Sequence, residues 1–203
     1  MGSSALFSLS YGLYVLIARD GERDCGCIVN TVTQLTEDPT RIAVSVNKRN
    51  FTNDVIQRTG VFNVSVLSEE ADMNLFRRFG FQSGRDADKF AGRDDPASEN
   101  GLRYLNKAAN ALISARVEQA IDCGTHMLYI ALVTEAQKLS AVPSMTYAYY
   151  FAHVKPQKPA GEKPKRGFVC RICGYFYEGE VLPPDFICPI CKHGASDFDP
   201  VGF

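Results

Sequence analysis

The chain has 203 residues, of which 45% are hydrophobic and 22% charged, and its formal net charge is −1. This composition predicts an ordinary water-soluble protein with one medium and one small domain, and it argues against nucleic acid or a bulk membrane surface as partner. No apolar run reaches the ~18 residues of a membrane-spanning helix. The first residues, MGSSALFSLS, lack the basic start and long apolar core of a secretory signal, so we expect a cytoplasmic location.

Residues 1–152 have the pattern of a mainly β domain. An apolar run at Tyr14–Ala18 ends at Asp20-Gly21, which is a hairpin signal, and Cys27–Val32 returns as the second strand. Alternating apolar and polar residues predict half-buried strands, and a nearly continuous apolar run predicts a central one. The half-buried strands are expected at 42–46, 62–66 and 113–117, and the central strand at 127–133. Many strands with few helices predict a β-barrel.

Two short helices are expected between these strands. The first spans 52–59, with Thr52 as its cap and Gly60 as its end. The second spans 68–79, with acidic residues in its first turn, basic residues in its last turn and Gly80 after it.

Two polar segments interrupt the strand pattern and are candidates for a binding site. Residues 30–34, NTVTQ, bring amides and hydroxyls into an apolar strand. Residues 46–52, VNKRNFT, lead from a strand into the first helix, where exposed N–H groups and the helix dipole favour a phosphate. Lys48 or Arg49 would complete its charge neutralisation. Asn and Thr at such junctions also cap helices without any ligand, so composition alone leaves both interpretations open.

A change of composition marks the boundary between the two expected domains. Residues 153–167, HVKPQKPAGEKPKRG, contain three prolines, two glycines and five basic residues, with no apolar periodicity. Such a segment is typical of a semi-extended, flexible linker. Residues 168–203 after it are too few to bury an adequate core alone, so we expect this second domain to fold with a bound metal.

Four cysteines in that second domain predict the metal site. They form two CxxC pairs separated by 14 residues, Cys170 with Cys173 and Cys188 with Cys191. Four thiolates in this arrangement suit tetrahedral zinc, which would make the segment a structural ribbon, or iron, which would make it a one-electron centre. The other three cysteines, Cys25, Cys27 and Cys123, form no disulfide framework and are expected to be small buried apolar residues.

The residues around the four cysteines favour iron over zinc. The chain reads CRICGYFY from Cys170 and later PPDFICPICKHGASDFDP, which closely resembles the rubredoxin domain in the shortened form attached to rubrerythrins. Aromatic residues can keep water away from the sulfurs, which tunes an iron centre and is not needed for structural zinc. The residues expected to form this shell are Tyr175, Phe176, Tyr177, Phe186 and Phe198.

The N-terminal part of the chain resembles the flavin reductase family. The resemblance covers about residues 5–152 and rests on SYGLYV, DCGCIVNTVTQ, RIAVSVNKRNFT, FNVSVLSE and FGFQSGRDADKF. It implies an FMN-binding split β-barrel that usually forms a homodimer. With its C-terminal segment, the whole chain resembles the high-molecular-weight rubredoxins of anaerobic bacteria. These are NAD(P)H-dependent flavoproteins that pass electrons to a flavodiiron protein.

Carried onto matching positions, the resemblance also implies the site residues. The flavin would be lined by the polar residues of the first segment, Asn30, Thr31, Thr33 and Gln34. Its phosphate and ribityl chain would be held by the second segment, through Asn47, Lys48, Asn50 and Thr52. The segment expected to cover the flavin contains Phe81, Ser83 and Arg85. His126 stands in GTHMLY, where the wider family often has GDH near the nicotinamide, and a lone histidine at a strand start is also often structural.

These expectations combine into a two-electron to one-electron converter. FMN can accept a hydride from NADH, or from NADPH, and release its electrons singly, while one FeS4 site changes by one electron at a time. The external acceptor suggested by the resemblance is a flavodiiron protein that reduces oxygen or nitric oxide. Two alternatives remain open: a free-flavin reductase with a structural zinc ribbon, and a non-enzymatic FMN and iron carrier that another protein reduces.

Overall fold

The computed structural model describes residues 8–156, 166–171, 175–188 and 193–202. Among these residues no helix is both long and apolar enough to cross a membrane. Cys173 and Cys191 lie outside the described residues, and so does most of the predicted linker.

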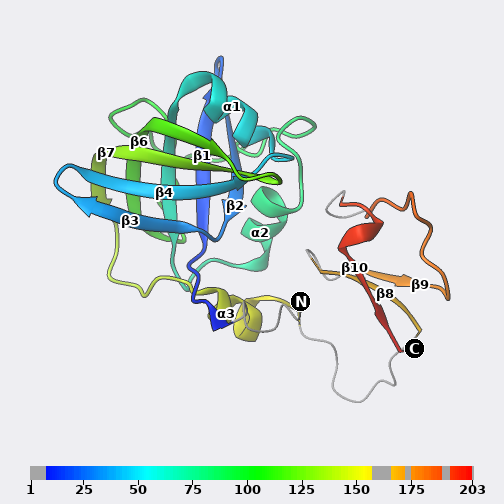
Figure 1. The fold of residues 1–203 in the computed structure, drawn as a ribbon. Helices are drawn as coiled ribbons and strands as arrows, with labels where there is room; N and C mark the ends of the chain where they lie inside the picture. The colour runs from blue at the N-terminus through cyan, green and yellow to red at the C-terminus, as the bar shows by residue number, and fades with distance from the viewer. Residues whose placement is uncertain (1–7, 157–165, 172–174, 189–192, 203) are drawn as a thin grey trace.

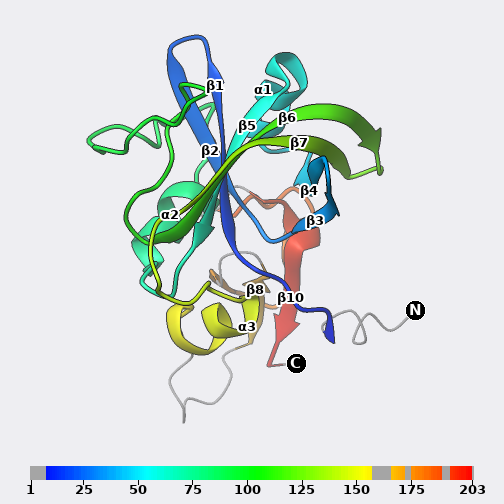
Figure 2. The same cartoon turned by 90° about the vertical axis from the view of Figure 1, so that its left-hand side faces the viewer.

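Seven antiparallel strands form the N-terminal barrel (Figures 1 and 2). In chain order they are β1 (Tyr14–Asp20), β2 (Arg23–Val29), β3 (Val32–Glu37), β4 (Thr40–Asn47), β5 (Val61–Leu67), β6 (Ala109–Asp122) and β7 (His126–Lys138). Their order in the sheet is β2-β1-β5-β6-β7-β4-β3, so β7 has a neighbour on each side, as predicted for the central strand.

Two helices follow strands of the barrel, and both differ from the predicted bounds at their start. Helix α1 (Phe51–Thr59) begins one residue earlier than expected and ends at Gly60, whose φ of 68° suits glycine. Helix α2 (Met73–Gly80) begins later than predicted, because Asp72 is its cap and accepts hydrogen bonds from the backbone of Asn74 and Leu75. The acidic residues before Asp72 therefore lie outside the helix.

The barrel packs around two groups of buried side chains. One fills the interior between the strands and α1, and its largest members are Phe62, Tyr129 and Leu16. The other packs α2 against the outside of β1 and against the turn α3 (Tyr147–Tyr149) with the π-helical turn η2 (Tyr150–Val154). This second group fixes the end of α2, which forms one wall of the candidate site.

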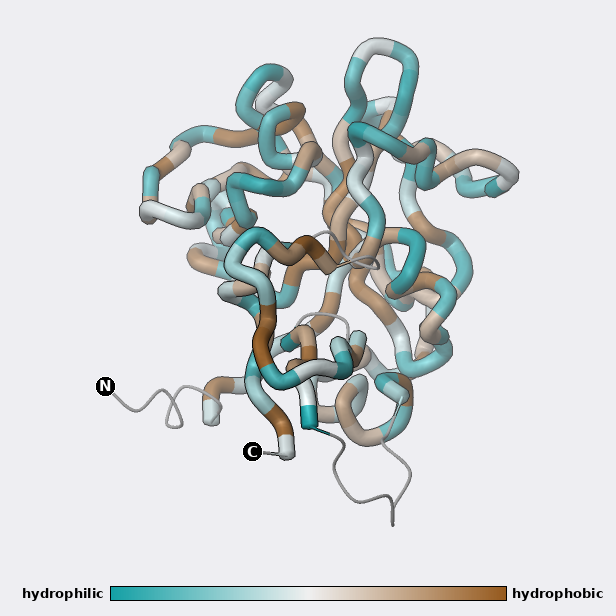
Figure 3. The backbone as a smooth tube through the Cα atoms, turned by 90° about the vertical axis from the view of Figure 1, so that its right-hand side faces the viewer, coloured by the Kyte–Doolittle hydropathy of each residue, from teal (hydrophilic) through white to brown (hydrophobic). Residues whose placement is uncertain are grey.

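The C-terminal domain is a small three-stranded antiparallel sheet of order β10-β8-β9. It consists of β8 (Gly167–Cys170), β9 (Phe176–Glu178), the short helix η3 (Ala195–Asp197) and β10 (Phe198–Val201). Figure 3 views the molecule from the side on which this domain lies, in front of the barrel. Its buried centre contains Cys170, Cys188 and Phe198, so the core of the domain is built around cysteines.

Two of the three cysteines outside the CxxC pairs are buried as predicted. Cys25 is 2% exposed and Cys27 is 5% exposed, both on strand β2. The prediction is wrong for Cys123, which is exposed because it lies in the turn between β6 and β7.

Candidate functional site

A cleft between the barrel and the C-terminal domain consists of two adjoining cavities. Their volumes are about 220 Å³ and 240 Å³. The walls that both cavities share are formed by Cys27, Asn50, Gly80, Gln82 and His193. The cleft therefore lies where β2, the start of α1 and the end of α2 meet.

One end of the cleft is polar and is formed around the start of α1. Asn50 caps this helix without a side-chain capping hydrogen bond, so the first N–H groups of the helix have no side-chain partner there. Arg49 and Lys89 add positive charge, and Thr52 and Ser83 add hydroxyls. Backbone N–H groups at a helix start together with cations and hydroxyls are the groups that bind a phosphate.

Lys89 is the most deeply buried charged group at this end. It is 4% exposed, and its Nζ donates to the backbone oxygens of Gly26 at 2.8 Å and Phe79 at 2.9 Å. Burial lowers the pKa of the Lys89 ammonium, and the cysteines on β2 oppose that shift. The lysine thus joins β2 to the end of α2 and lines the cavity between them.

The thiols on β2 are neutral groups rather than nucleophiles. Burial raises the pKa of Cys25 to about 11, and burial also raises the pKa of Cys27. Both thiols therefore stay protonated at neutral pH, and Cys27 contributes a small, soft surface to the cleft.

The other end of the cleft is apolar and aromatic. Its walls include Phe76, Phe79 and Phe81 from α2 and the residue after it, and Tyr147 and Tyr150 from the segment after β7. Phe76 and Tyr150 are in contact, with ring centroids 4.4 Å apart. A flat apolar wall next to a polar, cationic end fits a molecule with a planar ring system and a phosphate.

Glycines let the backbone come close to this cleft at two positions. A Cβ added to Gly84 would lie 3.0 Å from Cδ1 of Phe51, and one added to Gly26 would lie 3.1 Å from Cδ1 of Phe79. Both distances are shorter than ordinary van der Waals contacts between carbon atoms. Larger residues at Gly26 or Gly84 would therefore displace the aromatic rings beside the cavity.

The candidate metal centre lies in the C-terminal domain. Cys170 and Cys188 are both 0% exposed. The backbone N–H groups of both cysteines donate hydrogen bonds, from Cys170 to the oxygen of Tyr175 at 2.9 Å and from Cys188 to the oxygen of His193 at 2.8 Å. The surrounding rings are those of Phe168, Tyr175, Tyr177, Phe186 and Phe198, together with Phe81 of the barrel domain.

This arrangement fits a buried metal bound by thiolates. Phe186 lies 4.7 Å from Tyr177 and 5.4 Å from Phe198 between ring centroids, which makes the apolar shell continuous on that side. The two described cysteines supply half of the four ligands predicted from the sequence. No group of three metal-binding side chains occurs among the residues that the structure describes, because Cys173 and Cys191 fall outside them.

The two candidate centres meet at Phe81. This residue follows α2, lines the apolar cavity and packs into the buried cluster of Cys170, Cys188 and Phe198. An ion pair joins the domains beside it, between Arg49 Nη1 and Asp197 Oδ2 at 3.6 Å. The cleft and the cysteine centre are thus neighbours in space.

The structure brings together six of the eleven flavin-site residues expected from the sequence, and it leaves the other five and the predicted nicotinamide residue His126 outside the cavities. The residues that line the two cavities are Asn30, Asn47, Asn50, Thr52, Phe81 and Ser83. The residues that line neither cavity are Thr31, Thr33, Gln34, Lys48, Arg85 and His126.

Several residues of the second group have partners elsewhere. Lys48 Nζ lies 2.6 Å from Asp122 Oδ1, and this pairing lowers the pKa of the Asp122 carboxyl. His126 is in contact with the hydroxyl of Thr125, which lies 2.8 Å from its Nδ1. Arg85 stays close to the cleft, because its guanidinium lies 5.5 Å from the ring centroid of Phe51 and pairs with Asp54.

Other residues of the cleft were not singled out by the sequence. Lys89 lies within the FGFQSGRDADKF motif, and this was the only indication in the sequence that it could belong to the site. Tyr147 and Tyr150 also line the apolar cavity. His193, to which no role was assigned, lines both cavities, and no sequence pattern indicates this contact between the domains.

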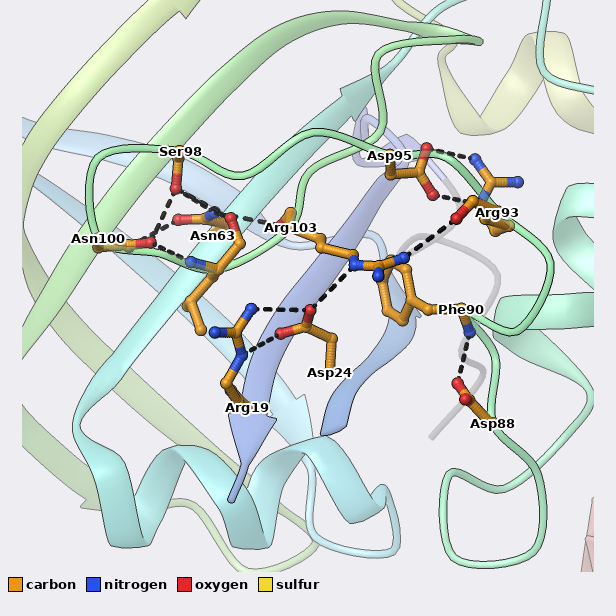
Figure 4. A network of polar contacts seen from close by, with 11 residues as sticks. Arg19, Asp24, Asn63, Asp88, Phe90, Arg93, Asp95, Ser98, Asn100 and Arg103 are labelled. Atoms are coloured by element: carbon orange, nitrogen blue, oxygen red, sulfur yellow. Dashed lines mark hydrogen bonds and ion pairs between the residues drawn. The ribbon is translucent and has the colours of Figure 1, made fainter. Parts of the chain in front are cut away.

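A polar network holds the long segment between α2 and β6 against the barrel (Figure 4). Asp24 of β2 accepts from Arg19 at 2.8 Å and 3.0 Å, and it pairs with Arg103 of the segment at 3.5 Å. Farther along, Asn63 of β5 donates to Ser98 at 2.7 Å and accepts from Asn100 at 2.8 Å. This segment also carries Ser83 and Lys89, so the network positions one wall of the cleft.

We expect the Asp24→Asn variant to lose stability. The Asp24 side chain is 4% exposed, and the substitution removes the charge that both arginines contact. Arg19 and Arg103 are partly exposed and regain water, so the loss in unfolding free energy should be about 1–3 kcal/mol. Chemical denaturation measures it. Asp20→Asn, which breaks the surface pair with Arg58, is the control, and equal losses in the two variants would contradict this role of Asp24.

Comparison with known proteins defines the class of this molecule. Residues 6–157 match the flavin reductase like domain, and residues 168–199 match the rubrerythrin, rubredoxin-like domain. The chain therefore belongs to the flavin reductase-like family and carries a rubredoxin-like domain after it. The predicted fold class, a mainly β split barrel with a small rubredoxin-like metal domain, is confirmed.

Particular relatives narrow this class. The chain is 39% identical to the high molecular weight rubredoxin of Moorella thermoacetica, over 99% of this chain and 100% of that protein, which confirms the predicted resemblance. It is 37% identical to a ferric-chelate reductase (NAD(P)H) of Archaeoglobus fulgidus, over 78% of this chain and 94% of that protein. An FMN-binding protein from Thermus thermophilus shares the fold, with a TM-score of 0.60 and 22% identity over 66% of this chain and 74% of that one.

Proposed function

We propose that the protein is an NAD(P)H-dependent oxidoreductase that carries electrons from a bound FMN to one iron at the four cysteines. The main support for this proposal is the position of Phe81, which lines the cleft and also packs into the cluster of Cys170 and Cys188. Bound FMN would take a hydride from NADH or NADPH and return two electrons one at a time to iron, which changes valence by one electron.

The residues of the cleft have distinct parts in this proposal. Arg49, Lys89 and the N–H groups at the start of α1 hold the phosphate, together with Asn50, Thr52 and Ser83. Phe79 and Phe81 hold the ring system on its apolar side, and Asn30 and Asn47 contact its polar edge. Five further residues would support the cleft wall or contact FMN at its rim. They are Thr31, Thr33, Gln34, Lys48 and Arg85. His126, beside the turn after β6, stays our candidate near the nicotinamide.

The C-terminal domain supplies the electron exit. Cys170, Cys173, Cys188 and Cys191 would bind the iron, and the aromatic residues around the two described cysteines exclude water from the sulfurs. We propose the organisation 1–152 for the flavin domain, 153–167 for a linker and 168–203 for the iron domain. The protein would act in the cytoplasm as a homodimer and pass electrons to an acceptor such as a flavodiiron protein.

Anaerobic mixing of the FMN-loaded protein with NADH tests the enzymatic part of the proposal. We expect the flavin absorbance to bleach on a catalytic time scale, and a parallel experiment with NADPH identifies the preferred nucleotide. If neither nucleotide bleaches the flavin while a chemical reductant does, the protein is an electron carrier that another protein reduces.

A further inference from the structure

The cleft has one wall from each half of the chain. Barrel residues form most of it, but Arg171 and His193 of the C-terminal domain line the apolar cavity, and His193 lines the polar cavity as well. The C-terminal domain lies beside the end of α2 in Figure 1 and in front of the barrel in Figure 3. The metal domain thus covers the mouth of the proposed flavin site.

The contact between the halves combines an apolar patch with a weak ion pair. Phe81 is 7% exposed within the cluster that contains Cys170 and Cys188. In the ion pair between Arg49 and Asp197, the arginine side chain is 69% exposed, so water screens the pair on that side, whereas Asp197 Oδ2 is buried. Contacts of this kind between domains of one chain form and separate readily.

The cleft in this arrangement has too little space for two ligands. Hydride transfer needs the donor and acceptor atoms about 3–3.5 Å apart, so the nicotinamide must lie directly on the flavin ring. The two cavities measure about 220 Å³ and 240 Å³. Each is smaller than the roughly 300–1,000 Å³ typical of a site for one small molecule. Together they lie within the range for one such ligand, so the two cavities have the size of a site for the flavin alone.

We infer that the C-terminal domain and the nicotinamide nucleotide bind the same part of the cleft and exclude each other. This inference rests on the proposed function and adds an order of events. The C-terminal domain leaves the cleft when the nucleotide enters, and it returns after the oxidised nucleotide has left. Arg171 and His193 are the residues whose positions the nucleotide would take, and the pair of Arg49 with Asp197 favours the closed state.

The Asp197→Lys variant tests this exclusion, because it replaces the attraction to Arg49 with repulsion. It also removes a pair with Arg171 within the C-terminal domain, whose nitrogen lies 3.9 Å from Asp197 Oδ1. Asp199→Lys is the matched control. It makes the same charge change two residues away on an exposed side chain that does not line the cleft. Both variants keep all four cysteines and every barrel residue.

We expect opposite changes in the two steps, the reduction of the flavin by NADH and the reduction of the iron by the flavin. In Asp197→Lys the KM for NADH should fall about fivefold, because less of the protein is closed, and iron reduction by the flavin should slow by about the same factor. Asp199→Lys should change neither. If both steps slow together in Asp197→Lys, the residue has only a structural role and the exclusion is wrong.

Small-angle scattering gives a second readout that does not depend on activity. The oxidised, FMN-loaded and iron-loaded protein should expand when NAD⁺, which cannot reduce it, is added, and Asp197→Lys should be expanded without nucleotide. Unchanged scattering at a nucleotide concentration that perturbs the flavin spectrum would overturn the exclusion alone. Absence of flavin bleaching by NADH and NADPH in every variant would overturn the proposed function and this inference together.

Discussion

Replacing Cys188 with serine is expected to abolish iron binding and every electron transfer beyond the flavin. Cys188 is 0% exposed within an apolar and aromatic cluster, and serine would offer the iron a hard hydroxyl oxygen in place of the soft thiolate. Structural metal sites contribute about 10–16 kcal/mol to the folding of small domains, so loss of one thiolate should unfold the C-terminal domain. Metal analysis and visible absorbance measure the loss of iron, and far-UV circular dichroism measures the loss of structure.

The barrel of the Cys188→Ser variant should remain active. NADH should still bleach the flavin, at the wild-type rate or faster, because an unfolded C-terminal domain cannot cover the cleft. Cys123→Ser is the control, since Cys123 is exposed in the turn between β6 and β7 and is not one of the four predicted ligands. If the Cys188→Ser variant still binds iron, and the flavin still reduces that iron at the normal rate, the ligand assignment is contradicted.

The second large effect is expected from Lys89→Met, which should release FMN. Methionine keeps the length of the side chain but removes the ammonium that bonds Gly26 and Phe79. Hydrogen bonds from a charged donor contribute about 1.5–3 kcal/mol each. Loss of the proposed contact with the phosphate should lower FMN affinity at least ~10-fold, and loss of the two backbone contacts should lower the unfolding free energy by about 2–4 kcal/mol. Equilibrium dialysis of FMN and chemical denaturation measure the two losses separately.

Lys48→Met is the matched comparison. It removes the same charge on the other side of α1's start, from an exposed pair with Asp122 that lines neither cavity. We expect FMN affinity to change less than twofold, as is typical of surface ion pairs. A result in the opposite order, with FMN lost in Lys48→Met and kept in Lys89→Met, would assign the phosphate contact to Lys48 instead.

Periodicity predicted most of the barrel because its strands are half-buried and alternate. The strands at 42–46, 62–66 and 113–117 all occur within longer strands of the sheet. The apolar run at 127–133 lies in an interior strand of the sheet, where buried residues alternate with half-buried ones. The start of α2 was placed too early, because Ser68 has a helix-start residue type but makes a β-bridge to Ser144 instead. That pairing is non-local and leaves no signal in a single sequence.

The candidate site was predictable where its residues follow one another in the chain. Asn47, Asn50 and Thr52 belong to a single strand-to-helix junction, and helix physics places Asn50 and Thr52 at the polar end of the cleft, while Asn47 lines the adjoining cavity. Thr33 and Gln34 were expected beside the flavin from the family resemblance, but β3 places both on an exposed strand. His193 reaches the cleft only through the contact between the two domains, which no local pattern encodes.

The most direct test of the central claim is an anaerobic titration of the full chain with NADH, followed by visible absorbance and paired with metal analysis. The account predicts one FMN and one iron per chain, bleaching of the flavin bands and of the iron absorbance by NADH, and three electrons taken up per chain, because FMN accepts two and iron accepts one. One zinc per chain, or an iron absorbance that persists after the flavin has been fully reduced, would contradict it.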